Sequence, residues 1–160
     1  MPTRTAPSVS STSEEAPAPT PRSDARSIPE PNASADAVAL LGPLYHLTDQ
    51  TQRASALLEA RRVLKPGGVV AAVGNPDPVR YPQWFTTAYL HLPEELADEV
   101  RHAGFDAVSL LGIEGPGWAM QEHWMDPDRR EQMLFAARAV ESESSLSGLS
   151  ANLLAAGTKH

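Results

Sequence analysis

Two short apolar runs, residues 37–41 and 69–73, stand out from the more polar sequence around them. Uninterrupted runs of this length are typical of strands that are buried on both faces of a sheet. The stretch between them, residues 49–64, has apolar side chains at helical spacing, namely Ala54, Leu57, Leu58, Ala60 and Leu64. A helix that joins two buried strands predicts a right-handed parallel crossover, so we expect an α/β fold.

Turn and capping residues mark the ends of these elements. Residues 42–43, Gly-Pro, end the first strand, and residues 66–68, Pro-Gly-Gly, end the helix. Asp49 and Gln52 have the spacing of a capping box, with Thr48 as the alternative cap. The charged residues of the helix are expected to lie largely off its apolar stripe; they are Arg53, Glu59, Arg61 and Arg62.

Further elements follow along the chain. Residues 93–104 predict a helix that begins at a proline, and residues 105–111 predict the next strand. Asp126 caps another helix, whose apolar stripe consists of Met133, Leu134, Ala137 and Val140. The serine-rich residues 142–147 predict a loop, and residues 149–156 predict a final strand.

Residues 1–35 have a different composition from the rest of the chain. They contain no aromatic residue, few large aliphatic ones, and prolines scattered among serine, threonine and alanine. Such a segment buries too little apolar surface to offset the entropy of ordering it. We therefore predict a disordered tail over residues 1–35 and a folded domain over residues 36–160. A linker or a proline-rich ligand is the functional alternative for the tail.

Composition and charge narrow the class of protein. A length of 160 residues predicts one domain, and the absence of cysteine excludes disulfides and thiolate metal sites. A net charge of −7 and a pI near 5.1 argue against nucleic acid or an anionic membrane as a partner. No apolar run approaches the roughly 20 residues of a spanning helix. We expect a soluble, cytoplasmic protein.

Two motifs then point to a family. Residues 41–47 read Leu-Gly-Pro-Leu-Tyr-His-Leu, and residues 62–68 read Arg-Val-Leu-Lys-Pro-Gly-Gly. At this spacing they resemble the fourth strand, the following helix and the fifth strand of class I S-adenosylmethionine-dependent methyltransferases. The resemblance implies a partial Rossmann-like sheet of the fourth to seventh strands, with the last strand antiparallel between the fifth and sixth. It also implies S-adenosylmethionine as cofactor and a small-molecule methyl acceptor.

By the same resemblance, the loop after the first predicted strand lies beside the cofactor and the transferred methyl group; its residues are Leu41, Gly42, Leu44, Tyr45 and His46. Open α/β sheets bind ligands at the carboxyl ends of their strands. Methyl transfer needs alignment of the reactants and at times a base. His46 is the candidate catalytic base, with a role in shaping the loop as the alternative.

Aromatic residues are the candidate substrate contacts. Tyr81, Trp84, Phe85 and Tyr89 form either a substrate-facing wall or the packed edge of a lid, and Trp118 follows a glycine-rich turn that positions it over the sheet end. No metal site is expected, because the remaining histidines lack paired spacing and a carboxylate cluster. We expect these histidines at the surface; they are His91, His102 and His123.

The first half of the family pattern is not visible. Glycine is absent before Gly42, so neither the glycine-rich cofactor turn nor the acidic ribose clamp can be assigned. We expect the chain to enter the fold at its fourth strand, and the tail to be either genuine or the product of a truncated or misframed upstream region. The alternative function is an inactive methyltransferase remnant that self-associates or binds a partner chain through its open sheet edge. A hydrolase is less consistent, since no nucleophile elbow and no cysteine occur.

Overall fold

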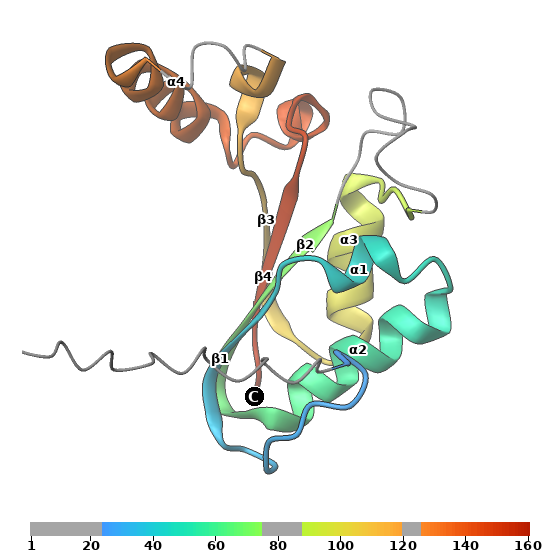
Figure 1. Cartoon of the computed structure of the whole chain (residues 1–160). Helices are drawn as coiled ribbons and strands as arrows, with labels where there is room; N and C mark the ends of the chain where they lie inside the picture. The colour runs from blue at the N-terminus through green and yellow to red at the C-terminus, as the bar shows by residue number, and fades with distance from the viewer. Residues whose placement is uncertain (1–23, 75–87, 120–125) are drawn as a thin grey trace, which may run out of the picture.

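A computed structural model of the chain describes residues 24–74, 88–119 and 126–160 (Figure 1). Four strands, four α-helices and two 3-10 helices are assigned within these ranges. In chain order they are β1 (Ala35–Leu40), α1 (Pro43–His46), α2 (Gln50–Val63), β2 (Leu64–Gly74), α3 (Pro93–His102), β3 (Asp106–Gly112), η1 (Gly115–Ala119), α4 (Pro127–Val140), η3 (Ser144–Leu149) and β4 (Leu153–Thr158).

The strands form one mixed sheet in the order β1-β2-β4-β3. β1 and β2 are parallel, with Ala37 opposite Val69 and Leu40 opposite Ala72. β4 is antiparallel to both of its neighbours, β2 and β3. These pairings confirm the predicted parallel crossover and the predicted place of the last strand. The α/β fold class, with a partial Rossmann-like sheet, is therefore confirmed.

The core lies between the sheet and three helices on one side of it. Figure 1 shows α1, α2 and α3 on the same side of the sheet. The apolar residues that meet there are buried, among them Leu40, Leu44, Leu57, Leu64, Val70, Leu96, Val100, Phe105 and Leu153. Each fully buried aliphatic side chain stabilises the fold by roughly 1.5–3 kcal/mol relative to exposure, so this face accounts for most of the hydrophobic stabilisation that the described residues provide.

The opposite face of the sheet is more open to solvent. Side chains alternate between faces along a strand, so the neighbours of the buried Leu40 and Val70 point the other way. Ala39 is exposed, and Val69 retains 43% of its surface. None of the three helices that cover the core reaches this side (Figure 1). The sheet is thus buried on one face within the described part of the chain, whereas a doubly covered sheet was expected.

α2 contains the largest difference from the predicted helix pattern. Its buried residues are Arg53, Ala56, Leu57, Ala60 and Val63, which follow the helical period and form one face. Arg53 was predicted to lie off the apolar stripe, and it is only 2% exposed. Leu58 was predicted within the stripe, and it is 55% exposed. The prediction was wrong because it assigned positions by polarity, whereas the helical period places the arginine on the inner face.

The ends of α2 agree with the sequence. Asp49 is the cap, and its carboxylate accepts a hydrogen bond from the backbone N–H of Gln52 at 3.1 Å. The helix ends at Val63, and β2 follows at once. Gly67 adopts a φ of +81°, a left-handed conformation that favours glycine.

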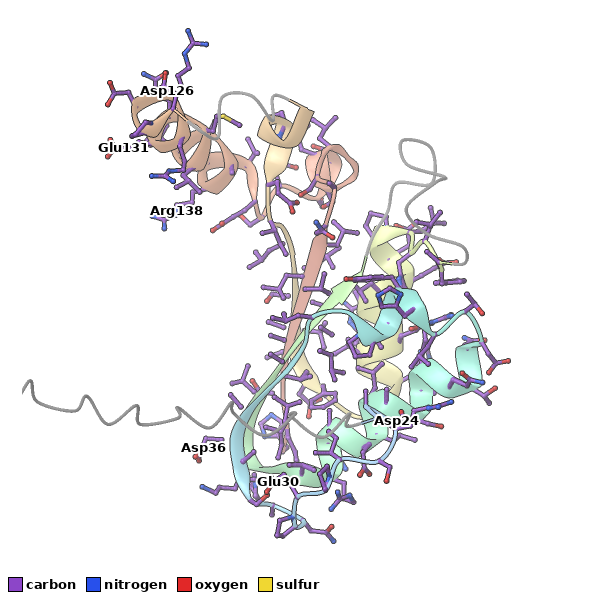
Figure 2. All side chains as sticks on the ribbon, viewed as in Figure 1. Asp24, Glu30, Asp36, Asp126, Glu131 and Arg138 are labelled. Atoms are coloured by element: carbon purple, nitrogen blue, oxygen red, sulfur yellow. The ribbon has the colours of Figure 1, made fainter. Side chains whose placement is uncertain are left out.

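The C-terminal elements are displaced from their predicted positions. β4 covers Leu153–Thr158, where residues 149–156 were predicted. The serine-rich stretch, predicted as a loop, forms the 3-10 helix η3. α4 buries Met133 and Ala137 as predicted, but Leu134 is 43% exposed. Charged side chains such as Glu131 and Arg138 project from α4 into solvent (Figure 2).

Residues 24–34 lie within the predicted tail, yet the structure places them against α2. The backbone N–H of Ile28 donates to Glu59, and Arg62 donates to the carbonyl oxygen of Ile28 and to the side chain of Asn32. The N–H of Ala33 bonds the carbonyl oxygen of Arg62 at 3.0 Å. Polar contacts to the helix thus hold a segment that has few large apolar side chains. The prediction for residues 1–23 lies outside the described residues.

Candidate functional site at the carboxyl end of β1

The chain turns sharply where β1 ends. Leu40 is buried as the last residue of β1, and Leu41 is 64% exposed immediately after it. Pro43 occupies the first position of α1, where the missing N–H costs nothing. Leu44 is fully buried beneath the turn and anchors it to the core. The loop therefore has an apolar inner anchor and an accessible outer side at the edge of the sheet where such folds bind ligands.

Two aromatic rings lie on this loop. The rings of Tyr45 and His46 have centroids 4.6 Å apart and are tilted by 51°. The Tyr45 hydroxyl donates a weak hydrogen bond to the carbonyl oxygen of Leu41 at 3.4 Å. His46 is exposed and Tyr45 half-buried. The side chains offered to solvent are thus one aliphatic group and two polar-tipped aromatic groups.

The segment at residues 88–92 lies directly against this loop. The backbone N–H of Tyr89 donates to the carbonyl oxygen of Tyr45 at 2.9 Å. The Tyr89 hydroxyl lies 3.3 Å from a carboxylate oxygen of Glu95, on α3. Burial raises the pKa of Tyr89, and the nearby negative charge of Glu95 raises it further. Tyr89 therefore stays neutral at ordinary pH and joins the loop to α3.

A buried arginine contacts both the loop and segment 88–92. The guanidinium of Arg53 donates to both carboxylate oxygens of Glu99, with the shortest bond at 2.7 Å. It also donates to the carbonyl oxygens of Leu47 and Thr48, each at 3.0 Å. Its face lies over the ring of Tyr89, with 3.5 Å between the guanidinium carbon and the ring centroid. Arginine geometry suits this combination, because the planar fork bonds at its edge and stacks on its face.

His91 completes the cluster and corrects a prediction. It was expected at the surface, but it is 1% exposed, and its Nε2 lies 3.3 Å from Glu99. Burial disfavours ionisation of Glu99, but the hydrogen bonds from His91 and Arg53 outweigh it, so the pKa of Glu99 lies below its ordinary value. Among the described residues, His91 Nδ1 has no hydrogen-bond partner. Nε2 is thus the ring nitrogen that contacts Glu99, and Nδ1 is the one left unpaired within this part of the structure.

The structure brings the predicted cofactor residues together in one loop. Leu41, Gly42, Tyr45 and His46 contribute accessible or half-buried surface, whereas the side chain of Leu44 faces the core. Their role in binding stays a prediction. Tyr89, a predicted substrate contact, lies beside the loop, but its ring packs on Arg53.

Other predicted positions lie elsewhere or cannot be placed. Tyr81, Trp84, Phe85 and His123 lie outside the described residues, as does the side chain of Trp118. The backbone of Trp118 belongs to η1, which follows β3 and packs on α4. His102 is exposed, as predicted.

Sequence reasoning missed the cluster of Arg53, Glu99 and His91. Its one sequence signal was the helical period that places Arg53 on the buried face, because Glu99 is 46 positions away along the chain. Within the three described ranges, no group of three His, Asp or Glu side chains is placed to hold a metal ion. No helix in these ranges is long and apolar enough to cross a membrane.

Comparisons with known proteins agree with the fold. A methyltransferase-domain family profile matches residues 5–72, a range that ends within β2 and includes most of the predicted tail. The predicted resemblance to S-adenosylmethionine-dependent methyltransferases is confirmed. The family match thus covers the loop after β1 and the Pro-Gly-Gly turn, the two motifs that carried the resemblance. A comparison with curated proteins finds no match.

Solved methyltransferase structures share the fold. An S-adenosylmethionine-dependent methyltransferase from Thermotoga maritima matches at a TM-score of 0.57 and 20% identity, over 86% of this chain and 62% of its own. A phosphoethanolamine N-methyltransferase from Haemonchus contortus in complex with S-adenosylmethionine matches at 0.53 and 15% identity, over 85% of this chain and 36% of its own. This chain thus spans less than two thirds of the length of either structure.

The fold alone does not specify methyl transfer. A [4+2]-cyclase also matches, at a TM-score of 0.51 and 22% identity, over 86% of this chain and 54% of its own. Different chemistries therefore occur on this methyltransferase-like fold, and function has to be argued from the residues of the site.

Proposed function

We propose that this chain contributes one wall of an S-adenosylmethionine site and takes part in methyl transfer to a small molecule. The observation that carries the proposal is the placement of loop 41–46 at the carboxyl end of β1, beside the parallel strand β2. The methyltransferase match over the same loop supports it.

The residues of the loop fit part of the cofactor. Leu41 offers an exposed aliphatic surface, and the rings of Tyr45 and His46 offer flat surfaces with polar tips. Such groups suit an adenine ring, which binds through apolar contact and stacking. The described loop has no carboxylate to bind the ribose hydroxyls. It therefore accounts for one wall of the site.

Methyl transfer requires few catalytic groups from the protein. Bound S-adenosylmethionine supplies an activated methyl group, and the protein aligns the acceptor and excludes water. His46 is exposed on the loop, and an imidazole side chain can take a proton from an acceptor. Its role as base and a small-molecule acceptor both belong to the proposal.

Titration calorimetry of the purified chain with S-adenosylmethionine tests this proposal. Leu41→Lys removes apolar contact and places a positive charge beside a cofactor that carries a sulfonium, so binding should weaken at least ~10-fold. Leu58→Lys is the matched control, because Leu58 is a similarly exposed leucine on α2. Equal affinities in the two variants, or no binding by the folded wild-type chain, would contradict the proposal.

A second candidate function is self-association through β1. In the described part of the chain β1 pairs with β2 alone, and its outward residues Ala37 and Ala39 are small and exposed. An edge strand with small exposed side chains favours antiparallel pairing of two copies about a two-fold axis. Sedimentation should therefore show a dimer that Ala39→Lys disrupts and Ala54→Lys, on the exposed side of α2, leaves intact. A monomeric wild-type chain would remove this candidate.

A further inference from the structure

We infer that Arg53 is a positioning residue that holds loop 41–48 and segment 88–92 in a fixed relation, so that ligand binding at the loop depends on a buried ion pair behind it. The inference rests on the proposed function for its effect on binding. The structural link between the two segments does not depend on the proposed function, because it follows from the observed geometry.

The edge of the guanidinium fixes the loop. Nη1 donates to the carbonyl oxygens of Leu47 and Thr48, which lie between α1 and α2. These carbonyls come just before the cap of α2, outside the hydrogen bonds of either helix. Without Arg53 both would need another donor in a partly buried place. These two bonds therefore join the loop to the Arg53 side chain.

The face of the same guanidinium fixes the second segment. The Tyr89 ring stacks on it at 3.5 Å, and the Tyr89 N–H bonds the carbonyl oxygen of Tyr45 at 2.9 Å. Tyr89 is thus held from both sides, by Arg53 through its ring and by the loop through its backbone. A change in the position of Arg53 moves Tyr89 and, through that hydrogen bond, the backbone of Tyr45.

Glu99 holds the arginine in place. Three N–H···O bonds join the two groups, and the side chains are only 2% and 12% exposed. His91 contacts the same carboxylate and lies against Gly74, where a Cβ would approach His91 Nδ1 to 3.0 Å. The network thus runs from α3 to the end of β2 and to the loop after β1, the two neighbouring strand ends of the proposed site.

Lysine cannot replace this arginine. An ammonium group has no plane to stack on Tyr89 and cannot bond a carboxylate and two carbonyls in the observed fork. A role limited to charge would be restored by lysine, whereas a positioning role would not. Arg53→Lys therefore separates the two explanations.

Amide hydrogen exchange without any ligand tests the link. In Arg53→Met, exchange of the Tyr89 amide and of residues 43–48 should accelerate at least ~10-fold relative to the amides of β2 and β4, because bonds to a charged donor are lost. Arg53→Lys should give most of the same acceleration. Arg61→Met is the matched control, since Arg61 also lies on α2 but bonds the carbonyl oxygen of Gly104. It should leave the Tyr89 amide unchanged.

Calorimetry with S-adenosylmethionine on the same variants tests the consequence. Affinity should fall at least ~10-fold in Arg53→Met and Arg53→Lys and stay within ~2-fold in Arg61→Met. Unchanged exchange at Tyr89 in a folded Arg53→Met overturns the inference, as does full rescue by lysine. Accelerated exchange in a chain whose wild type binds no cofactor sustains the link and removes the proposed function instead. If Arg53→Met fails to fold, Arg53→Lys and Glu99→Gln provide the same comparison.

Discussion

Replacing Gly68 by alanine should destabilise the fold through the pairing of β1 with β2. A Cβ at Gly68 would lie 2.9 Å from the backbone oxygen of Lys65, 2.9 Å from a methyl carbon of Leu64 and 3.1 Å from the backbone oxygen of Asp36 in β1. Carbon and oxygen in ordinary contact are at least ~0.3 Å further apart, and two of these neighbours are backbone atoms that cannot rotate away. The backbone at Gly68 must therefore shift, both relative to Leu64 and Lys65 within β2 and away from Asp36 in β1.

The expected cost is ~1–3 kcal/mol, the range for overpacking a site that cannot relax freely. Chemical denaturation followed by circular dichroism measures it, with Gly148→Ala as the matched control because nothing lies within 4 Å of a Cβ there. The control should change stability by no more than ~1 kcal/mol, in the stabilising direction. Amide exchange should also accelerate along β1 in Gly68→Ala. A variant as stable as wild type, or one with unchanged protection in β1, would refute the close approach of the strands.

Three further predictions follow from the core and the buried ion pair. Leu57→Ala should lower the free energy of unfolding by ~2–5 kcal/mol because Leu57 is fully buried, whereas Leu58→Ala next to it should cost less than ~0.5 kcal/mol; denaturation of both variants checks this. Glu99 has a pKa below its ordinary 4.5, so the stability it contributes is present above that pH and is lost as pH falls below it. Glu99→Gln should therefore flatten the acid limb of a stability profile, and an unchanged limb would contradict the role of the ion pair. Arg53 lowers the raised pKa of Tyr89, so Arg53→Met should move that tyrosine to a still higher pH in a spectroscopic titration, and a shift to lower pH would contradict the stacking.

The sequence predicted the parts of the fold that depend on local patterns. The apolar runs at β1 and β2 and the cap at Asp49 each carry their information within a few positions, and all are confirmed. The Pro-Gly-Gly stretch at residues 66–68 lies within β2 instead of forming the turn that was predicted to end the helix. The antiparallel place of β4 came from family resemblance, and its bounds were displaced because periodicity locates strand ends poorly.

The buried polar cluster could not be predicted in the same way. Arg53 and His91 are polar residues in stretches that allow a surface position, and their burial depends on Glu99, which is far from Arg53 in the sequence. A charged side chain is buried only when partners satisfy it, and those partners are set by tertiary packing. The helical period of α2 was the one available signal, since it places residue 53 on the face of Ala56, Leu57 and Ala60.

The resemblance to methyltransferases gives the loop after β1 a role that the fold alone leaves open. Within the described residues this loop, its arginine and the end of β2 form one connected structure at the edge of the sheet where we propose that the cofactor binds. The open face and edge of the sheet support self-association as the competing function. Cofactor binding predicts that S-adenosylmethionine contacts loop 41–46, whereas self-association predicts that a second copy contacts β1.

Chemical-shift mapping of the isotopically labelled chain with S-adenosylmethionine tests the central claim most directly. The account predicts saturable shifts of the amides of Leu41, Gly42, Tyr45 and His46, with smaller shifts at Tyr89 and none along α4. Shifts confined to α4, or none anywhere in a folded chain, would contradict the assignment of this loop as a cofactor wall.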